Sequence, residues 1–177
     1  AKYVEANNST AGVLRCSGTV NYFVDSSNSK GTGAYGIKPD AGYFNMKGKL
    51  RINGDYGLWV GNATAVVDAD IINTGYNSAM EVSGSGSLDF TGRAYSTELF
   101  GLEMAGGTAY LHDAIIQSAA TTSGGADGSA ISYYGGDLVE LDNVRLICVD
   151  PLAKSIETQG HSGSTVKVYT SCFATNP

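Results

Sequence analysis

A stretch of 17 residues occurs twice in this chain, 44 positions apart. Residues 56–72 read YGLWVGNATAVVDADII, residues 100–116 read FGLEMAGGTAYLHDAII, and a weaker copy lies between them at 78–90. A fixed period near 22 residues is typical of stacked-repeat proteins, in which each unit buries its apolar face only against its neighbours. This repeat constrains the fold more than any other feature of the sequence.

Two series of apolar residues follow the repeat. The first series is Leu14, Ile37, Leu58, Met80, Leu102, Ile131 and Ile156, and the second is Met46, Val67, Phe90, Leu111, Leu141 and Val168. Both series are spaced by 21 to 23 residues until they lengthen at the same two places, within 121–128 and near 151–154. The repeat is therefore kept throughout, and we expect the added residues to form surface loops.

Each unit holds three short apolar runs, such as Leu58/Val60, Ala65/Val67 and Ile71/Ile72, and none has the spacing of an amphipathic helix. Runs this short suit strands that coil around an axis and pair with their counterparts one turn above and below. The sequence predicts an all-β fold, a single-stranded parallel β-helix of about seven turns. We expect one domain over 1–177, with an N-terminal turn or arm at 1–34, including a loop at 25–33, and regular coils at 35–173.

The repeat pattern Gly-Leu-x-Val-x-Gly-Gly-x-x-x-Leu-x-Asp-x-x-Ile resembles the repeats of right-handed parallel β-helices of the pectin-lyase-like class, especially autotransporter passengers and surface adhesins. The resemblance covers about residues 35–173. It implies the architecture but no single activity, because such repeats serve adhesins, lyases, phage tailspikes and structural proteins alike. The three cysteines depart from autotransporter passengers, which tend to lack this residue.

The charge is unevenly divided along the chain. Residues 1–51 carry seven bases and three acids, a net charge of +4, whereas the remainder carries four bases and fourteen acids, a net charge of −10. In a linear stack this division predicts a dipole along the axis. So acidic a body is not expected to bind nucleic acid, and no apolar run approaches 18 residues, so no membrane insertion is expected. A first residue of Ala1 fits a processed secreted protein or a fragment, and we expect a secreted, extracellular or cell-surface location.

One outward position recurs between the two inward residues of the first strand of each unit, and it holds Trp59, Glu81, Glu103, Ser132 and Glu157. Adjacent turns would place the carboxylates of Glu81 and Glu103 about 5 Å apart, as in a retaining glycosidase. Trp59 beside them could stack on a sugar ring. A solvated acidic face is the more common meaning of such a column, so Glu81 and Glu103 are catalytic candidates only in an alternative hypothesis.

Aspartate and asparagine recur at one corner of successive units, at Asp68, His112-Asp113 and Asp142-Asn143. Stacked carboxylates could hold calcium, but these residue types favour corners because they tolerate turn conformations and bond along the stack. We therefore expect no metal and no cofactor.

Three cysteines cannot all pair within one chain. Cys148 and Cys172 are 24 positions apart, about one turn, so a disulfide between them is possible in an oxidising compartment. Cys16 is then either a buried thiol or the site of a cross-link between subunits.

These observations favour a non-catalytic extracellular structural protein that assembles head to tail with copies of itself into a filament, sheath or surface layer. Both ends of a β-helix expose strand edges, and no capping helix is evident at either end of the sequence. The alternative is a surface adhesin or a phage tailspike fragment that binds, or less plausibly cleaves, polysaccharide.

Overall fold

The structure, a computed structural model, describes residues 1–6, 12–29, 35–121, 128–159, 163–169 and 172–175. Within these residues it contains fifteen strands and no helix, so none of them forms a helix that could cross a membrane. The strands are β1 (Tyr3–Ala6), β2 (Leu14–Phe23), β3 (Ser26–Ser29), β4 (Ile37–Ile52), β5 (Leu58–Val60), β6 (Asn62–Asn73), β7 (Met80–Val82), β8 (Ser87–Ser96), β9 (Leu102–Ala105), β10 (Thr108–Ser118), β11 (Ile131–Gly135), β12 (Leu138–Cys148), β13 (Ile156–Thr158), β14 (Thr165–Val168) and β15 (Phe173–Thr175).

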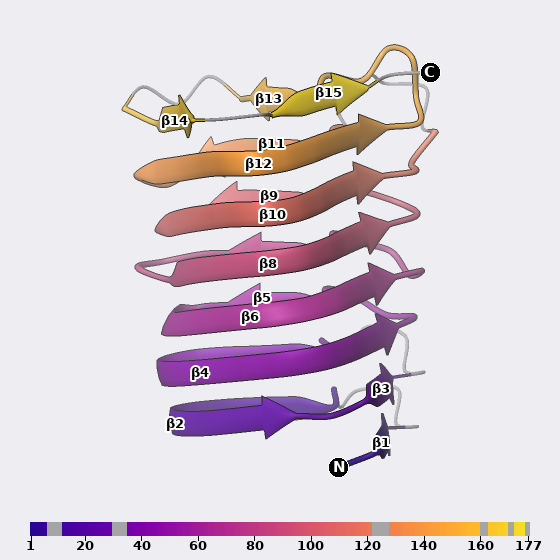
Figure 1. Ribbon diagram of the computed structural model, residues 1–177, viewed down its shortest axis with the longest axis vertical. Coiled ribbons are helices and arrows are strands. Elements are labelled where there is room, and N and C mark those ends of the chain that lie inside the picture. Colours follow the sequence, from indigo (N-terminus) through magenta and orange to yellow (C-terminus); the bar gives the residue numbers. More distant parts are fainter. Residues whose placement is uncertain (7–11, 30–34, 122–127, 160–162, 170–171, 176–177) are drawn as a thin grey trace.

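The strands stack into a parallel β-solenoid of about six turns (Figure 1). Long strands form one stack in the order β4-β6-β8-β10-β12-β14, and short strands form a second stack in the order β4-β5-β7-β9-β11-β13. The two termini lie at opposite ends of the stack (Figure 1). The prediction of an all-β parallel β-helix is confirmed, with a turn count close to the seven expected, because the last turn consists only of the short strands β13, β14 and β15.

The register confirms both apolar series residue by residue. In the short-strand stack, Leu58 pairs with Met80 and Met80 with Leu102, and the series runs without a break from Leu14 to Ile156. In the long-strand stack the second series runs from Met46 to Val168 in the same way. Apart from members in the terminal turns, these side chains are fully buried and form the core of the solenoid.

The second and third apolar runs of each unit form one bent strand rather than two strands. Residues Ala65 to Ile72, for example, all lie within β6. The bend falls at the corner expected to hold Asp and Asn, where Asp113 and Asn143 have positive φ angles of 49° and 54°. Asn143 Nδ2 donates a hydrogen bond to Asp113 Oδ1 (2.6 Å) one turn away. This confirms that the corner selects residues that tolerate turn conformations.

The loop predicted at 25–33 is wrong in its first half. Ser26–Ser29 forms β3, which pairs with both β1 and β4 and buries Ser27 and Ser29. Serine and asparagine have a low strand propensity, but two neighbouring strands impose the extended conformation on them. β1 lies in what was expected to be an arm. The remainder of that loop and most of the insertion expected at 121–128 lie outside the described residues.

A column of buried polar residues lies inside the solenoid at the C-terminal ends of the long strands β6, β8, β10 and β12. Asn73 pairs with Ser96, Ser96 with Ser118, and Ser118 with Cys148, and all four side chains are buried. Their side chains donate to main-chain carbonyl groups of the turns, for example Ser96 Oγ to Asn77 O (2.9 Å) and Cys148 Sγ to Lys154 O (3.4 Å). The column therefore satisfies turn carbonyls that would otherwise be buried without a partner.

Candidate functional site

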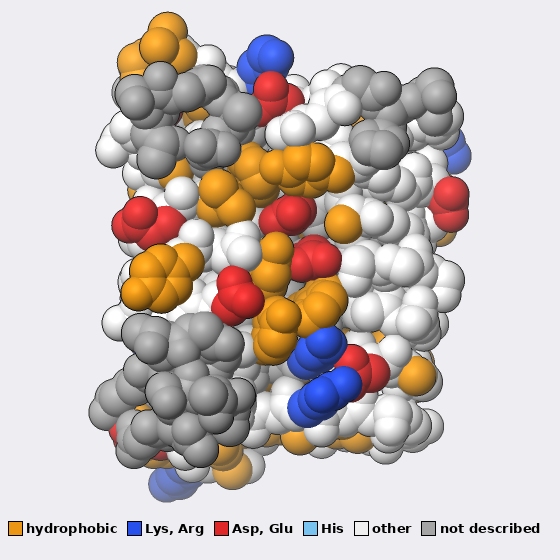
Figure 2. Space-filling view, turned by 180° about the vertical axis from the view of Figure 1, so that it is seen from behind, with side chains coloured by type: hydrophobic (Ala, Val, Ile, Leu, Met, Phe, Trp, Pro, Cys, Tyr) orange, Lys and Arg blue, Asp and Glu red, His pale blue; other side chains and the backbone are white. Residues whose placement is uncertain are grey.

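The outward column predicted from the sequence exists and is longer than predicted. Trp59 pairs with Glu81, Glu81 with Glu103, and the column continues through Ser132 to Glu157. Towards the N-terminal end the same position is occupied by Lys38 and Arg15, because Ile37 pairs with Leu58 and Leu14 with Ile37. We call this column, Arg15-Lys38-Trp59-Glu81-Glu103-Ser132-Glu157, the lateral strip. Hydrophobic and acidic side chains run along this face, with Lys and Arg side chains below them (Figure 2).

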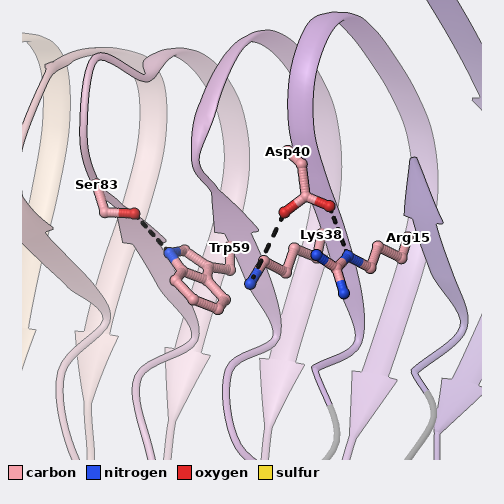
Figure 3. A network of polar contacts seen from close by, with 5 residues as sticks. All are labelled: Arg15, Lys38, Asp40, Trp59 and Ser83. Carbon is pink, nitrogen blue, oxygen red and sulfur yellow. Dashed lines mark hydrogen bonds and ion pairs between the residues drawn. The ribbon is translucent and has the colours of Figure 1, made fainter. Parts of the chain in front are cut away.

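The N-terminal part of the lateral strip is cationic. Arg15 Nε forms an ion pair with Asp40 Oδ2 at 2.6 Å, and Lys38 Nζ lies 3.8 Å from Asp40 Oδ1 (Figure 3). Two cations therefore share one carboxylate. Sequence analysis missed both of them, although each directly follows a member of the first apolar series, so extending the outward column to that series would have found them.

The middle of the strip is aromatic. The ammonium nitrogen of Lys38 lies 3.1 Å from the ring centroid of Trp59, and Trp59 Nε1 donates to Ser83 Oγ at 2.6 Å (Figure 3). Tyr35 packs against Trp59 at a centroid distance of 4.5 Å, and Tyr56 packs against it at 6.0 Å. The rings of Tyr35 and Tyr56 also stack on each other at 5.9 Å. Trp59 is thus held by a cation–π contact, by a hydrogen bond and by two rings. A sugar would have to use the part of the indole that these contacts leave open, so glycan binding at Trp59 stays a prediction.

The upper part of the strip is acidic and largely desolvated. Glu81 is 7% exposed, and burial, followed by the charge of Glu103, raises its pKa to about 7. Burial also raises the pKa of Glu103, although Ser78 Oγ donates to its Oε2 at 2.9 Å. Burial and the charges of the two glutamates raise the pKa of the Tyr56 phenol. Since both carboxyl groups bind protons more tightly than usual, the pair carries fewer than two negative charges at neutral pH.

The strip does not assemble the parts of a metal site. Among the described residues there is no group of three His, Cys, Asp or Glu side chains that could hold an ion. Hydrolysis by the two glutamates stays a prediction of the alternative hypothesis, and the expectation that the protein is not an enzyme also stays a prediction.

The three cysteines, all within the described residues, form no disulfide. Cys148 is buried in the polar column and ends β12. Cys172 precedes Phe173, which pairs with Arg145, so Cys172 lies near the middle of β12 and well short of Cys148. The disulfide that the spacing made possible between Cys148 and Cys172 is absent, because one turn at this end takes 27 residues (Leu141 to Val168) or 28 (Arg145 to Phe173), more than the 24 that separate the two cysteines. Cys16 is half-buried at the N-terminal end, and a cross-link through it stays a prediction.

A separate recess of about 370 Å³ lies on the long-strand face and is lined by Asp89, Tyr110, Leu111, His112, Glu140, Asp142 and Tyr169. His112 Nε2 is paired with Asp89, and Lys167 Nζ lies 2.9 Å from Glu140 Oε1. Two of its acidic groups are thus already paired with cationic or ionisable side chains of the protein itself.

Both ends of the solenoid expose strand edges. Within the described residues, β2 pairs only with β4 and β1 only with β3 at the N-terminal end, while β13 pairs only with β11, and β14 and β15 only with β12, at the C-terminal end. The inward residues there are only half-buried, namely Leu14, Val20 and Tyr22 at one end and Ile156 and Val166 at the other. Large apolar side chains are also exposed at both ends, including Tyr3, Phe23, Val168 and Phe173.

No protein-family model matches the chain, and no curated protein or solved structure compared with it matches either. The resemblance of the repeats to those of known β-helices is therefore carried by the repeat pattern and by the solenoid fold.

Proposed function

We propose that the chain is a structural building block that associates end to end with copies of itself. The observation that carries this proposal is the state of the two ends, where, within the part of the chain that the structure describes, the terminal strands have one unpaired edge and the apolar columns end on half-exposed side chains. An open strand edge pairs readily with another strand, and half-exposed apolar columns gain free energy when they are covered.

A second copy is the natural partner because all strands run in the same direction. Every strand pair in the solenoid is parallel, so a copy placed on the same axis offers its N-terminal edge to the C-terminal edge below it with the correct polarity. Such a contact joins two different surfaces, and repeating it gives an open filament.

The dipole along the axis, which the sequence predicted, is not the force that we expect to join the two ends. Residues 52–144 contain one base and twelve acids, a net charge of −11, whereas residues 145–177 contain three bases and two acids, a net charge of +1. The acids therefore lie in the middle of the solenoid and not at its C-terminal end. Apolar burial and strand pairing, and not an axial dipole, are the forces that we expect at the ends.

The kinship of the chain and its location belong to the same proposal. The repeat pattern supports kinship with right-handed β-helices of the pectin-lyase-like and surface-adhesin kind, and a secreted or cell-surface location fits a structural role outside the cell. The alternative, polysaccharide binding by an adhesin or a tailspike fragment, would use the lateral strip near Trp59, where Lys38 already contacts the ring.

Analytical ultracentrifugation with negative-stain electron microscopy tests the proposal. We expect association that grows with protein concentration and produces rods with the width of one solenoid. Val168→Asp, at a side chain 58% exposed on the last turn, should weaken association, whereas Tyr76→Asp, at a side chain 69% exposed in the middle of the solenoid, should not. A wild-type protein that stays monomeric at every concentration would overturn the proposal.

A further inference from the structure

We propose that one flat face of the solenoid binds the surface of an anionic lipid bilayer. The face is formed by the C-terminal segments of the long strands, from β4 through β6, β8, β10 and β12, and by β15 above them (Figure 1). We call it the arginine face. The contact is peripheral, since no strand has to enter the bilayer, and it does not depend on the proposed end-to-end association.

Two columns of outward side chains make up the arginine face. The first column is Lys49, Asp70, Arg93, Ile115, Arg145 and Phe173. The second column is Arg51, Ile72, Tyr95, Gln117, Ile147 and Thr175. The residues between the two columns point inward, and Leu50, Ile71 and Ala94 among them are buried. The face is therefore a single layer of side chains on a packed core.

Basic side chains gather on this face of an otherwise acidic protein. The two columns hold four bases and one acid, a net charge of +3, whereas the rest of the chain holds seven bases and sixteen acids, a net charge of −9. Three of the four arginines of the chain are in the two columns. An anionic plane therefore attracts this face and repels the remainder of the molecule, which orients the solenoid on the plane.

The three arginines are not neutralised by acids of the protein itself. The side chains of Arg51, Arg93 and Arg145 are all exposed. Within the described part of the chain, no ion pair or side-chain hydrogen bond holds Arg51 or Arg145. Arg93 Nη2 donates to the neutral Oε1 of Gln117 at 2.7 Å. All three guanidinium groups thus keep donors for an anionic partner.

The acids closest to these arginines are already engaged. Asp70, the one acid in the two columns, lies 3.5 Å from Lys49 Nζ. Glu5, at the N-terminal margin of the face, accepts a hydrogen bond from a tyrosine hydroxyl group at 2.7 Å. Neither carboxylate contacts an arginine, so the positive charge of the face remains open to a partner.

The arginines recur on every second strand. Arg51 is in β4, Arg93 in β8 and Arg145 in β12, so they follow one another at about 9.6 Å along the axis, twice the spacing of neighbouring strands. This separation is close to the Debye length of about 8–10 Å at physiological salt. The three charges therefore repel one another only weakly, although all of them reach the same plane.

Apolar side chains occupy positions between and beside the arginines. They are Ile72, Tyr95, Ile115, Ile147 and Phe173, all of them partly or fully exposed. A bilayer surface accommodates both kinds of side chain, because arginine is attracted to anionic headgroups and apolar and aromatic side chains enter the headgroup region. A soluble polyanion would cover the arginines and leave the isoleucines in water. The mixture therefore favours a lipid surface over a soluble polyanion.

A recess of about 290 Å³ beside Arg145 offers a seat for one headgroup. Its lining includes Ile115, Arg145 and Phe173, and also the carboxylate of Asp113. Arginine binds phosphate through charge-assisted hydrogen bonds, and a carboxylate pairs with an ammonium group. This pair of opposite charges matches a headgroup that carries both a phosphate and an amine, as phosphatidylserine does.

Cosedimentation with vesicles tests the proposal. We expect the protein to bind vesicles made of equal parts of phosphatidylserine and phosphatidylcholine, to bind less as the salt concentration rises, and not to bind vesicles of phosphatidylcholine alone. The combined variant Arg51→Gln, Arg93→Gln, Arg145→Gln should bind about 100-fold more weakly, because each basic residue near an anionic surface contributes about fivefold.

A second combined variant is the matched control. Arg15→Gln, Lys47→Gln, Lys167→Gln removes the same charge from side chains that are 76%, 62% and 50% exposed but lie outside the arginine face. Its binding should stay within a few-fold of the wild type. Equal losses in the two combined variants, or no binding of the wild type to the anionic vesicles, would overturn the proposal.

The apolar side chains separate a bilayer from a soluble polyanion. Ile115→Ser and Phe173→Ser should each weaken vesicle binding, because apolar contact with the headgroup region is lost, and neither changes the charge of the face. The same variants should leave any binding of heparin unchanged. If heparin binds the wild type as tightly as the vesicles do, and neither serine variant weakens vesicle binding, the partner is a soluble polyanion and the lipid assignment is wrong.

Discussion

Glu81 lies directly opposite Glu103 in the parallel ladder of β7 and β9, and both carboxyl groups are desolvated. Adjacent parallel strands are about 4.8 Å apart, so two ionised carboxylates in this position repel each other. The protein reduces that repulsion by holding protons, since the pKa of Glu81 rises from an ordinary value near 4.5 to about 7. This pair makes the stability of the solenoid dependent on pH.

The first prediction is that stability falls as pH rises from about 4.5 to about 7. The folded state binds the Glu81 proton more tightly than the unfolded state, so the folded state holds more protons in this range and loses stability with increasing pH. One pKa unit corresponds to about 1.4 kcal/mol, and partial screening by solvent reduces the effect. We expect the free energy of unfolding to fall by about 1–2 kcal/mol between pH 4.5 and pH 7, measured by urea denaturation.

Glu81→Gln should remove most of this pH dependence. It should also stabilise the protein at pH 8, because the amide does not ionise and leaves no negative charge in the desolvated site. Glu140→Gln is a control, since Glu140 is on the other face and is paired with Lys167. A Glu81→Gln protein with the same dependence on pH as the wild type would show that the pair does not titrate as described.

The apolar columns were predictable from the sequence because they obey a strict geometric rule. Leu58, Met80 and Leu102 must stack if the repeat is a turn, and no other arrangement keeps all three inside. The same rule predicted the facing of Trp59, Glu81 and Glu103. The repeat predicts which side chains in a column touch less directly than it predicts which residues stack. The contact of Lys38 with the ring of Trp59 was therefore missed, even though the register implied that the two residues are neighbours.

The ends were the least predictable parts of the molecule. Ser26–Ser29 forms a strand because β1 and β4 flank it, and not because of its own composition. The position of Cys172 depends on how many residues the last turn takes, 28 from Arg145 to Phe173, which the spacing of the cysteines alone does not reveal. The contacts between charged and aromatic side chains across turns also depend on rotamers, which the sequence does not specify.

The second prediction concerns the contact of Lys38 with Trp59. Lys38→Met should lower the free energy of unfolding by about 1 kcal/mol, because a partly desolvated cation–π contact is lost. The side chain of Lys38 is only 16% exposed. Trp59 is the single tryptophan of the chain, so its emission should change in Lys38→Met but not in Lys47→Met, which removes an exposed cation elsewhere. Equal stability of the two variants would contradict the assigned contact.

The same tryptophan reports on the glycan alternative. If the lateral strip binds polysaccharide, oligosaccharides should alter the emission of Trp59 in a saturable way, and Glu81→Gln should change their affinity. Emission that stays constant over a broad panel of oligosaccharides would exclude binding at this strip while leaving the end-to-end proposal intact.

The third prediction concerns Asn73, the amide in the buried polar column. Its Nδ2 donates to the carbonyl groups of Asp55, Asn77 and Ser78, and its Oδ1 accepts from Gly75 N at 2.9 Å. Asn73→Ala should lower the free energy of unfolding by about 2–4 kcal/mol, because buried carbonyl groups lose their donors. Asn73→Ser should cost less, since Ser96 bonds a turn carbonyl from the same column. Equal losses would assign the effect to lost volume rather than to hydrogen bonds.

The fourth prediction separates two ways in which a glycine can be required. Gly18 and Gly48 both have positive φ angles, 89° and 122°, but a Cβ at Gly18 would meet no atom within 4 Å, whereas at Gly48 it would lie 1.7 Å from the carbonyl oxygen of Val24. Gly18→Ala should therefore cost only the conformational strain, about 1–2 kcal/mol. Gly48→Ala must also displace the adjacent turn, where Val24 N donates to Lys47 O at 3.1 Å.

We expect Gly48→Ala to lower the free energy of unfolding by at least about 3 kcal/mol, because a clash with backbone adds to the strain. Thermal and urea denaturation of both variants at one pH measure the difference. Equal costs would mean that the turn of Val24 moves aside freely, and the close stacking of the first two turns would then be wrong. A larger cost for Gly48→Ala shows that the turn of Val24 is packed closely on β4, which an end surface that pairs with a second copy requires.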